Sequence, residues 1–453
     1  MFHKIVVANR GAIAARVLRA LKKLGIRSVA VYSQADAGLP YLAEADETFC
    51  IGRAEPKASY LNQDALLDVL RQSGADGLHP GYGFLSENAE FARRVNASGA
   101  RFIGPSPEWI EAMGHKTRAR DLMAQHGLPM APSSGLLTGD PAQALKAAQA
   151  IGFPVLVKPA AGGGGIGMVA AHDADELVQA IARAGSLSER SFGCAEIYLE
   201  RLMLKPRHIE FQILADRHGN VRHLFERDCS IQRRHQKVIE ESPAPLLPRA
   251  LASAAGENMV KVLGKLRYDV IGTVETLYGG GSDFQFLEMN TRLQVEHAVT
   301  EEVTGIDLVV AQIRLAAGER IDDVLPPVIT TQGHAIEARI YAEDPVRFYP
   351  SPGLLKKLRL PSGEGIRVET GFAEGCSVTP YYDPMIAKLI VHAADRASAI
   401  DRLIAALDAT CIEGVKHNIP FIRQVLDSEE FRAGRVHTGL GAEVLAQERK
   451  AVA

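Results

Sequence analysis

In the N-terminal part of the chain, short apolar runs alternate with stretches in which apolar residues recur every three or four positions. The runs predict buried strands, and the longer stretches predict helices. The expected strands are 4–8, 27–32, 75–78 and 101–104, and the expected helices follow Gly11 and cover 64–71 and 87–95. Strands and helices that alternate through short loops favour a doubly wound parallel sheet. We interpret His79, in the loop after the third strand, as structural, since isolated histidines in such positions usually are.

The rest of the chain contains two further groups of elements in which strands predominate. In the middle, the expected strands are 154–158, 168–171, 197–200, 208–215 and 221–226, with helices at 113–125, 173–184 and 303–317. Towards the C-terminus, the expected strands are 333–340, 354–360, 366–370 and 385–392, followed by helices at 397–409 and 420–427. A linker rich in Pro, Ser and Gly after residue 127 separates the first group from the second. The pattern indicates an α/β protein, α+β over its full length, without internal repeats.

The run 286–296 has the most informative pattern in the chain. Polar residues occupy every second position from Glu288 to Glu296, and the residues between them are mostly apolar. This alternation predicts an extended strand with one polar face. Phe284 and Phe286 share the parity of Glu288, so the same face is apolar one step earlier. A carboxylate at the end of a buried face needs a cation, because an unpaired buried charge is too costly.

A neighbouring strand supplies a second carboxylate. The β-prone run 272–277 is followed by a glycine-rich turn at 279–282, so the chain folds back and brings Glu275 opposite residues 286–288. Cross-strand neighbours lie about 5 Å apart, and two carboxylates at that distance repel unless a divalent cation lies between them. The side chains predicted to hold Mg²⁺ or Mn²⁺ are Glu275, Glu288 and Asn290. The alternative is a polar strand face in water.

The predicted strand cannot run straight to its last carboxylate. Eight steps of extended chain from Glu288 to Glu296 would span about 26 Å, which is too far for one reaction centre. We therefore expect a bend after Asn290, so that the second half of the run binds a different ligand from the first.

Composition and charge limit the classes of function. A length of 453 residues suggests about three domains. The net charge of −3 gives no sign of a nucleic-acid or membrane partner, and no apolar run suits a spanning helix or signal peptide. The five cysteines are scattered without paired spacing, so neither zinc nor a disulfide framework is indicated. These features indicate a reduced, cytoplasmic enzyme.

Two loops are candidates for function. A strand follows the glycine run 162–167, and Lys158 precedes it, so the run is neither a dinucleotide fingerprint nor a Walker-type phosphate loop. We expect a hairpin tip whose exposed amides suit phosphate and which acts as a lid; a plain flexible linker is the alternative. The densely polar run 228–237 is either a solvated surface or part of a site.

Together these stretches resemble biotin carboxylase, the ATP-grasp component of acyl-CoA carboxylases. The motifs that carry the resemblance are ANRG at 8–11, HPGYGFLSEN at 79–88, MGHK at 113–116, GGGGIGM at 162–168, RDCSIQRRHQK at 227–237, FLEMNTRLQVEH at 286–297 and GHAIEARI at 333–340. The resemblance extends over nearly the whole chain, and two of the motifs are long and highly specific. It implies an N-terminal doubly wound domain at 1–115, an ATP-grasp domain at 116–325 with a mobile glycine-rich lid at about 131–203, and a mixed α/β C-terminal domain at 326–447.

The resemblance also implies how ATP is bound. Lys116 and Lys158 would bind the phosphates as point charges, with the amides of Gly164 and Gly165 covering them. The residues that would line the adenine are Glu200, Arg201, Leu202 and Met203, and those that would contact the ribose or phosphates are His208, Gln232 and His235. The magnesium ligands would be the same as those predicted above, namely Glu275, Glu288 and Asn290.

By the same resemblance, the reaction would join bicarbonate to biotin. The bicarbonate ligands would be Lys237, Arg292, Gln294 and, through its backbone, Val295. Glu296 would be the base for bicarbonate, and carboxyphosphate would form with release of ADP. Arg339 would bind biotin and stabilise negative charge on its ureido oxygen, while the carboxylated ring would leave on a carrier protein.

The implied partners are a biotin carboxyl carrier protein and a separate carboxyltransferase subunit. The chain would be a stand-alone subunit, because no biotin-acceptor segment follows residue 440. The resemblance suggests a homodimer, with Arg16 and Arg19 as candidate interface residues.

Three positions depart from the family pattern. Ile166 replaces a usual Arg or Lys in the glycine loop, Ala161 replaces a glycine, and Ala298 replaces a usual proline. A missing cation would weaken lid closure over ATP, so a second hypothesis is a catalytically weak, nucleotide-binding subunit of a carboxylase complex. A third is an ATP-grasp ligase acting on another carboxylate, against which Arg339 and the bicarbonate-sized loop argue.

Overall fold

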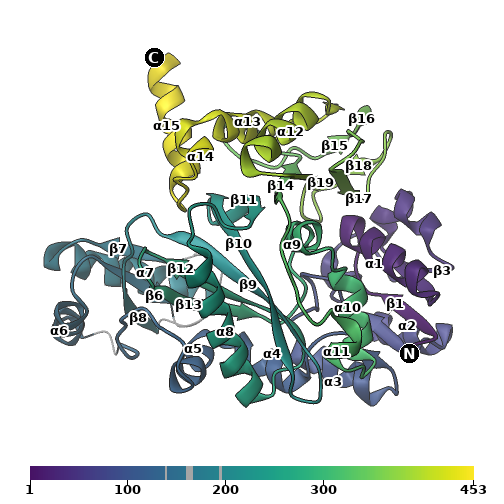
Figure 1. The fold of residues 1–453 in the computed structure, drawn as a ribbon, viewed down its shortest axis with the longest axis horizontal. Helices are drawn as coiled ribbons and strands as arrows, with labels where there is room; N and C mark the ends of the chain where they lie inside the picture. Colours follow the sequence, from purple (N-terminus) through teal and green to yellow (C-terminus); the bar gives the residue numbers. More distant parts are fainter. Residues whose placement is uncertain (138–139, 160–166, 193–195, 453) are drawn as a thin grey trace.

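The N-terminal part of the chain forms a parallel five-stranded sheet, in a computed structural model that describes residues 1–137, 140–159, 167–192 and 196–452. Its strands are β1 (Lys4–Val7), β2 (Arg27–Tyr32), β3 (Glu47–Cys50), β4 (Gly77–His79) and β5 (Arg101–Phe102), in the order β3-β2-β1-β4-β5. The helices that follow the strands are α1 (Gly11–Leu24), α2 (Gln63–Ser73) and α3 (Ala89–Ala97), with short 3₁₀ turns at Gln34–Asp36, Pro40–Glu44 and Pro56–Ala58. All neighbouring strands are parallel, so the predicted doubly wound sheet is confirmed (Figure 1).

An eight-stranded antiparallel sheet of described residues forms the centre of the molecule. Its strands, in spatial order, are β13 (Phe284–Asn290), β12 (Val270–Tyr278), β9 (Arg207–Ala215), β10 (Val221–Arg233), β11 (Gln236–Ser242), β14 (His334–Tyr341), β19 (Met385–Ala393) and β17 (Ile366–Thr370). The pairing of Ile239 on β11 with Ala338 on β14 joins the middle of the chain to its C-terminal part. The two later groups of predicted strands therefore share one sheet.

A smaller three-stranded sheet, within the described ranges, lies at the left edge of the molecule in Figure 1. It consists of β7 (Val169–Ala171), β6 (Val155–Pro159) and β8 (Ile197–Arg201), with helices α6 (Pro141–Ile151) and α7 (Ala174–Phe192). Strands β6 and β7 pair antiparallel on either side of the glycine run, as a hairpin requires. The tip at 160–166, including Ala161, Gly164, Gly165 and Ile166, lies outside the described residues.

The remaining helices surround the two large sheets (Figure 1). They are α4 (Pro107–Gly114), α5 (Lys116–Gln125), α8 (Arg249–Leu266), α9 (His297–Thr304), α10 (Leu308–Ala316), α11 (Ile321–Val324), α12 (Arg396–Asp408), α13 (Ile419–Asp427), α14 (Glu429–Arg432) and α15 (Leu440–Val452). Short paired strands complete the C-terminal part: β15 (Gly353–Leu354) with β18 (Ser377–Val378), and β16 (Lys357–Arg359) with β20 (Cys411–Glu413).

Two helices predicted as continuous are each broken into two. The helix expected at 113–125 divides at His115, which is extended (φ −107, ψ 104) and whose ring nitrogen caps the next turn at the amide of Arg118. Lys116 is therefore the first residue of α5. The helix expected at 303–317 divides because Gly305 adopts a left-handed φ of 70 and Asp307 caps α10. Apolar periodicity continues across both breaks, which is why it did not reveal them.

One apolar cluster connects the N-terminal and C-terminal parts of the molecule. It includes Ile13 and Leu18 of α1, Ile313 of α10, Ile336 of β14 and Leu389 of β19, all buried. Full burial of such a side chain contributes roughly 1.5–3 kcal/mol, so this cluster holds α1 firmly against the central sheet. Loops of the N-terminal unit are thereby fixed beside the strand ends that carry the polar residues described next.

Candidate active site

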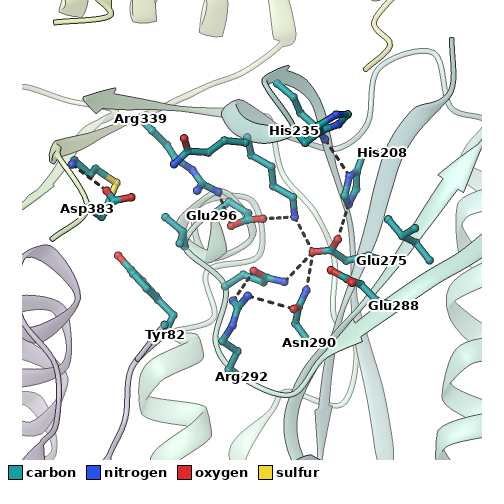
Figure 2. A pocket seen from close by; sticks show the side chains of 18 of the residues that line it. Tyr82, His208, His235, Glu275, Glu288, Asn290, Arg292, Glu296, Arg339 and Asp383 are labelled. Carbon is teal, nitrogen blue, oxygen red and sulfur yellow. Dashed lines mark hydrogen bonds and ion pairs between the residues drawn. The ribbon is translucent and has the colours of Figure 1, made fainter. Parts of the chain in front are cut away.

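A cavity of about 840 Å³ lies between the central sheet, the small sheet and the N-terminal loops. Its walls include every predicted site residue that the structure describes: Lys116, Lys158, Glu200, Arg201, Leu202, Met203, His208, Gln232, His235, Lys237, Glu275, Glu288, Asn290, Arg292, Gln294, Val295, Glu296 and Arg339. The predicted Gly164 and Gly165 lie outside the described residues. Residues from distant parts of the sequence thus meet in one space large enough for a nucleotide and a small acid (Figure 2).

The two acidic strands pair as predicted. Glu275 on β12 is the direct cross-strand partner of Glu288 on β13, and a register shift follows between Glu275 and Thr276. Strand β13 ends at Asn290, so the expected bend is confirmed. Lys116 lies 2.8 Å from Glu288 in an ion pair, so the β13 carboxylate already has a cation within reach.

Lys237 lies at the centre of the acidic groups. Its Nζ is 2.6 Å from Glu210 Oε2, 2.8 Å from Glu275 Oε1 and 2.7 Å from Glu296 Oε1. Burial alone would lower the pKa of Lys237, but these carboxylates raise it well above its ordinary value. Lys237 is therefore a permanent cation, and it connects Glu275 of the acidic strand pair to Glu296, the predicted base.

Glu296 is buried between two cations. Arg339 Nη2 donates to its Oε2 at 2.8 Å, and Lys237 contacts its other oxygen. Burial would raise the pKa of Glu296, but Lys237, Arg339 and Arg227 together hold it well below its ordinary range. The carboxylate is thus ionised at neutral pH, as a proton acceptor must be.

Arg339 is held from behind by a second carboxylate. Its Nε lies 2.6 Å from Glu240 Oε1, and Glu240 on β11 is the direct cross-strand partner of Glu337 on β14. Burial raises the pKa of Glu240 to about 8 and that of Glu337 to about 7. Two fully buried carboxylates side by side cannot both ionise cheaply, so this pair retains a proton near neutral pH.

This pair predicts a specific pH dependence of stability. The folded-state pKa values lie above the ordinary 4.5, so the contribution of the pair is fully present below about pH 4.5 and is lost as pH rises through 7 to 8. Glu240→Gln removes one ionisable member of the pair. Between pH 5 and pH 8, the free energy of unfolding of this variant should therefore decrease by about 1 kcal/mol or more less than that of the wild type. Urea unfolding at pH 5, 6, 7 and 8 measures the difference; parallel curves would contradict it.

The residues after the bend form a hydrogen-bonded turn around Arg292. Its Nε donates to Glu87 Oε2 at 2.8 Å, and its Nη1 donates to Gln294 Oε1 at 2.8 Å. Gln294 Nε2 in turn donates to Glu275 Oε1 at 3.2 Å. The turn therefore presents a guanidinium and an amide within reach of the acidic pair, and such hydrogen-bond donors suit a small carboxylic acid.

The other end of the cavity carries the two predicted phosphate lysines. Lys158 Nζ lies 3.1 Å from Glu200 Oε1, and Arg120 Nη1 lies 2.9 Å from the other oxygen of Glu200. The adenine segment begins at Glu200, but the side chain of Arg201 turns to the carbonyl of Ile151 at 2.6 Å. Only part of the predicted segment thus directs its side chains towards the cavity.

The polar run 228–237 is mostly buried or half-buried, and its exposed residues are Arg234 and His235 at the turn. Asp228 and Ser230 are buried, and the run forms the β10–β11 hairpin. Gln232 Nε2 lies 3.0 Å from His208 Nδ1, so two predicted ribose or phosphate ligands contact each other. His235 occupies the hairpin turn with a φ of 67.

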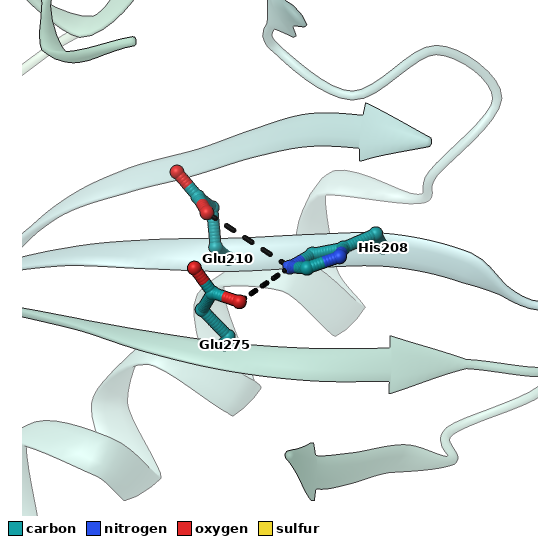
Figure 3. A group of neighbouring side chains, drawn as sticks. All are labelled: His208, Glu210 and Glu275. Atoms are coloured by element: carbon teal, nitrogen blue, oxygen red, sulfur yellow. Dashed lines mark ion pairs between the residues drawn. The ribbon is translucent and has the colours of Figure 1, made fainter. Parts of the chain in front are cut away.

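A different trio from the predicted one forms a compact donor cluster. His208, Glu210 and Glu275 bring possible metal-ligating atoms within 4.8 Å of one another (Figure 3). His208 Nε2 lies 2.9 Å from Glu275 Oε2. The predicted Glu288 and Asn290 approach the same carboxylate from β13, and Asn290 Nδ2 donates to Glu275 Oε1 at 2.7 Å. Glu275 is therefore common to both sets of residues. Its carboxylate oxygens are hard ligands, which suit a cation such as Mg²⁺.

Sequence reasoning missed several residues that support the site. They are Glu87, Glu210, Arg227, Glu240 and Glu337, of which the last four are buried. Arg227 donates to Glu210, Gln212, Thr273 and Thr300 and so fixes the carboxylate that contacts Lys237. Alternation in 208–212, where His208, Glu210 and Gln212 share one parity, was the signal that could have found Glu210.

Fold and site together define an ATP-grasp ligase, with two lysines and two strand carboxylates around a nucleotide-sized cavity. Family models for "Biotin carboxylase, N-terminal domain", "Carbamoyl-phosphate synthase L chain, ATP binding domain" and "Biotin carboxylase C-terminal domain" match residues 1–110, 115–324 and 337–442. The chain belongs to the biotin carboxylase family, and the predicted resemblance is confirmed.

Curated relatives cover almost the whole chain. A biotin carboxylase of Halalkalibacterium halodurans is 51% identical and covers 97% of this chain and 97% of its own length. A pyruvate carboxylase subunit of Methanothermobacter thermautotrophicus is 48% identical over 97% of this chain and 89% of its own length.

Solved structures agree with the fold. The biotin carboxylase domain dimer of Hydrogenobacter thermophilus 2-oxoglutarate carboxylase, in complex with MgADP, ADP and bicarbonate, superposes with a TM-score of 0.92 at 44% identity, covering 98% of this chain and 99% of that one. Biotin carboxylase of Campylobacter jejuni in a β-γ-ATP complex gives a TM-score of 0.93 at 42% identity, with the same coverage. The predicted fold class is therefore confirmed.

Proposed function

We propose that this chain carboxylates the biotin of a carrier protein, using ATP and bicarbonate and releasing ADP and phosphate. The observation that carries the proposal is the arrangement of Lys237 and Arg339 on either side of the buried Glu296, beside the Arg292 turn and on the wall of one cavity. Arg292 and Lys237 offer a site for an anion, Glu296 offers a base beside it, and Arg339 offers a guanidinium next to that base. The relatives named biotin carboxylase support the same reaction.

ATP would occupy the end of the cavity that carries Lys116 and Lys158. These lysines suit phosphates as point charges. When the nucleotide binds, they would leave their present partners, Glu288 and Glu200, and contact its phosphates. Glu275, Glu288 and Asn290 would hold Mg²⁺, which supplies charge neutralisation at the phosphates. The Hydrogenobacter domain, whose fold this chain shares, forms a complex with MgADP, which supports binding of a nucleotide together with Mg²⁺.

Bicarbonate would bind at the turn formed by Arg292, Gln294 and the Val295 backbone, next to Lys237. One of its oxygens attacks the γ-phosphorus, the bond to ADP breaks, and Glu296 takes the hydroxyl proton. Because Lys237 then shares its charge with the bound anion, the basicity of Glu296 rises when the substrate arrives.

Carboxyphosphate then breaks down to carbon dioxide and phosphate. The phosphate takes the proton from the ureido nitrogen of biotin, and that nitrogen attacks carbon dioxide. Arg339 faces Glu296 and lines the cavity, so its guanidinium would stabilise the negative charge that develops on the ureido oxygen. Exclusion of water by the cavity would protect carboxyphosphate from hydrolysis.

The test is ADP release by the purified chain with ATP and Mg²⁺. Release should depend on bicarbonate and rise when free biotin is added. Folded protein that shows no rise at saturating ATP would contradict the proposal. Faster release with citrate or an amino acid would instead favour a ligase for another carboxylate.

A metal prediction follows from the β13 carboxylate. Glu288→Gln should raise the Mg²⁺ concentration required for half-maximal ADP release by about 10–100-fold, because one hard anionic ligand is lost. Glu257→Gln, an exposed glutamate on α8, is the matched control and should leave the requirement unchanged. An unchanged requirement in Glu288→Gln would remove this residue from the metal site.

The same proposal covers partners and organisation. A biotin carboxyl carrier protein and a separate carboxyltransferase would complete the reaction, and the acceptor is left to them, since relatives carry names as different as pyruvate carboxylase and 2-oxoglutarate carboxylase. A homodimer would use the face that carries the exposed Arg19, whereas Arg16 is buried against Glu301 and Asp307. We also propose three domains, at 1–115, 116–325 and 326–447. The proposed location of the protein is the cytoplasm. Within the described residues, no helix is long and apolar enough to cross a membrane.

A further inference from the structure

Lys388 is a buried cation that the reaction described above does not use. It lies on β19, its side chain is 0% exposed, and its cross-strand partners are Arg339 on β14 and Glu369 on β17. Its Nζ lies 2.8 Å from Glu369 Oε2 and 3.6 Å from Glu337 Oε2. Burying such a group is costly, and well-packed apolar residues often stabilise a fold as well as a buried ion pair does. The charge therefore points to a role beyond packing.

A further contact of Lys388 reaches the proposed bicarbonate turn. Its Nζ donates to the carbonyl oxygen of Val295 at 2.5 Å. The preceding carbonyl, that of Gln294, accepts from His297 Nδ1 at 2.8 Å, and His297 is also fully buried. Two successive peptide carbonyls of the turn are thus held by buried side chains. Gln294 and Val295 line the cavity on their other side.

The turn needs this support because it belongs to neither a strand nor a helix. Strand β13 ends at Asn290 and helix α9 begins at His297, so residues 291–296 lie in the turn between them. An unrestrained peptide group in a turn has conformational freedom, and fixing it costs entropy when a ligand binds. A charge-assisted hydrogen bond to the Val295 carbonyl removes that freedom beforehand.

We propose that Lys388 is a positioning residue for bicarbonate. Its ammonium group fixes the Val295 peptide, and Glu369, at 2.8 Å, supplies the main charge that keeps the lysine in place. The inference rests on the proposed function, in which the Val295 backbone binds bicarbonate, and it adds a residue from the C-terminal part of the chain that never contacts the substrate.

The experiment compares the double variant Glu369→Gln/Lys388→Met with the wild type. The double change removes the cation together with its nearest carboxylate, so no strong uncompensated charge is created, and Arg367 keeps its contacts with Glu301 and Glu302. The KM for bicarbonate should rise about tenfold, while the KM for ATP changes less than about twofold. Lys357→Met, at a partly exposed lysine paired with Glu413, is the control and should change neither constant.

The outcomes separate the positioning role from a structural one. A loss of folded protein, or equal changes in both KM values, would overturn the proposal, because a general packing defect does not select one substrate. The single variant Glu369→Gln keeps the lysine and its bond to Val295 but removes the nearest carboxylate, so its KM for bicarbonate should rise by clearly less than in the double variant. An unchanged KM for bicarbonate in the folded double variant would also overturn it. Absence of bicarbonate-dependent ADP release in the wild type would instead reject the proposed function.

Discussion

Replacing Glu296 with glutamine is expected to lower kcat for bicarbonate-dependent ADP release by about 10²–10⁴-fold. Glutamine keeps the size of the side chain and one acceptor oxygen but cannot take a proton from bicarbonate. Lys237 and Arg339 hold the native carboxylate ionised, so its loss removes the only base proposed for this step. Initial rates of ADP formation at saturating ATP and bicarbonate measure the change, and the KM for ATP should remain within about threefold of the wild type.

The control for this prediction is Glu302→Gln on α9. Glu302 is partly exposed and pairs with Arg367 at 3.1 Å, so it belongs to the same helix region but not to the cavity. Its kcat should match that of the wild type. If Glu296→Gln remained folded and turned over at more than a tenth of the wild-type rate, a group other than Glu296 would be the base.

The acidic hairpin was predictable from sequence because every interaction that defines it is local. The turn at 279–282 fixes which residues face each other, and a period of two fixes which side they face, so the sequence alone predicts Glu275 opposite residues 286–288. The bend after Asn290 followed from chain length alone. Local geometry and motif resemblance together therefore defined the ends of the cavity.

The charge network behind the site could not be predicted in this way. Lys237 contacts Glu210, which is 27 positions earlier, and Lys388 contacts Val295, which is 93 positions earlier. These contacts depend on the strand order of the central sheet, which short-range patterns do not encode. Period-two patterns mark Glu240 and Glu337 as strand residues, but only the β11–β14 pairing makes them neighbours.

The prediction of two continuous helices, at 113–125 and 303–317, was wrong for a different physical reason. An apolar stripe persists through His115 because Met113 and Met123 face the same core. Apolar residues also continue past Gly305, although Val303 and Leu308 pack into different clusters. The breaks come from backbone dihedral angles and capping groups, and capping competes with propensity one residue at a time. The consequence for function is that Lys116 lies at a helix start, from which it reaches Glu288.

Replacing Arg339 with methionine is expected to separate the two halves of the reaction. Biotin-stimulated ADP release should fall by about 10²–10³-fold, because the guanidinium that would stabilise the ureido oxygen is lost. Slow ADP release without biotin should persist, since the ATP and bicarbonate residues are unchanged. Glu240, whose pKa burial raises to about 8, can carry the proton that its buried pair with Glu337 retains near neutral pH, which limits the damage to the fold when the cation is removed.

Arg339→Lys refines this prediction, because lysine keeps the charge but lacks the planar fork that contacts Glu240 and Glu296 together. It should recover part of the biotin stimulation, to about a tenth of the wild type. Arg222→Met, at an exposed arginine paired with Asp322, is the control and should leave both activities unchanged. Equal loss of the biotin-dependent and biotin-independent rates in Arg339→Met would show that Arg339 acts through Glu296, and its assignment to biotin would then be wrong.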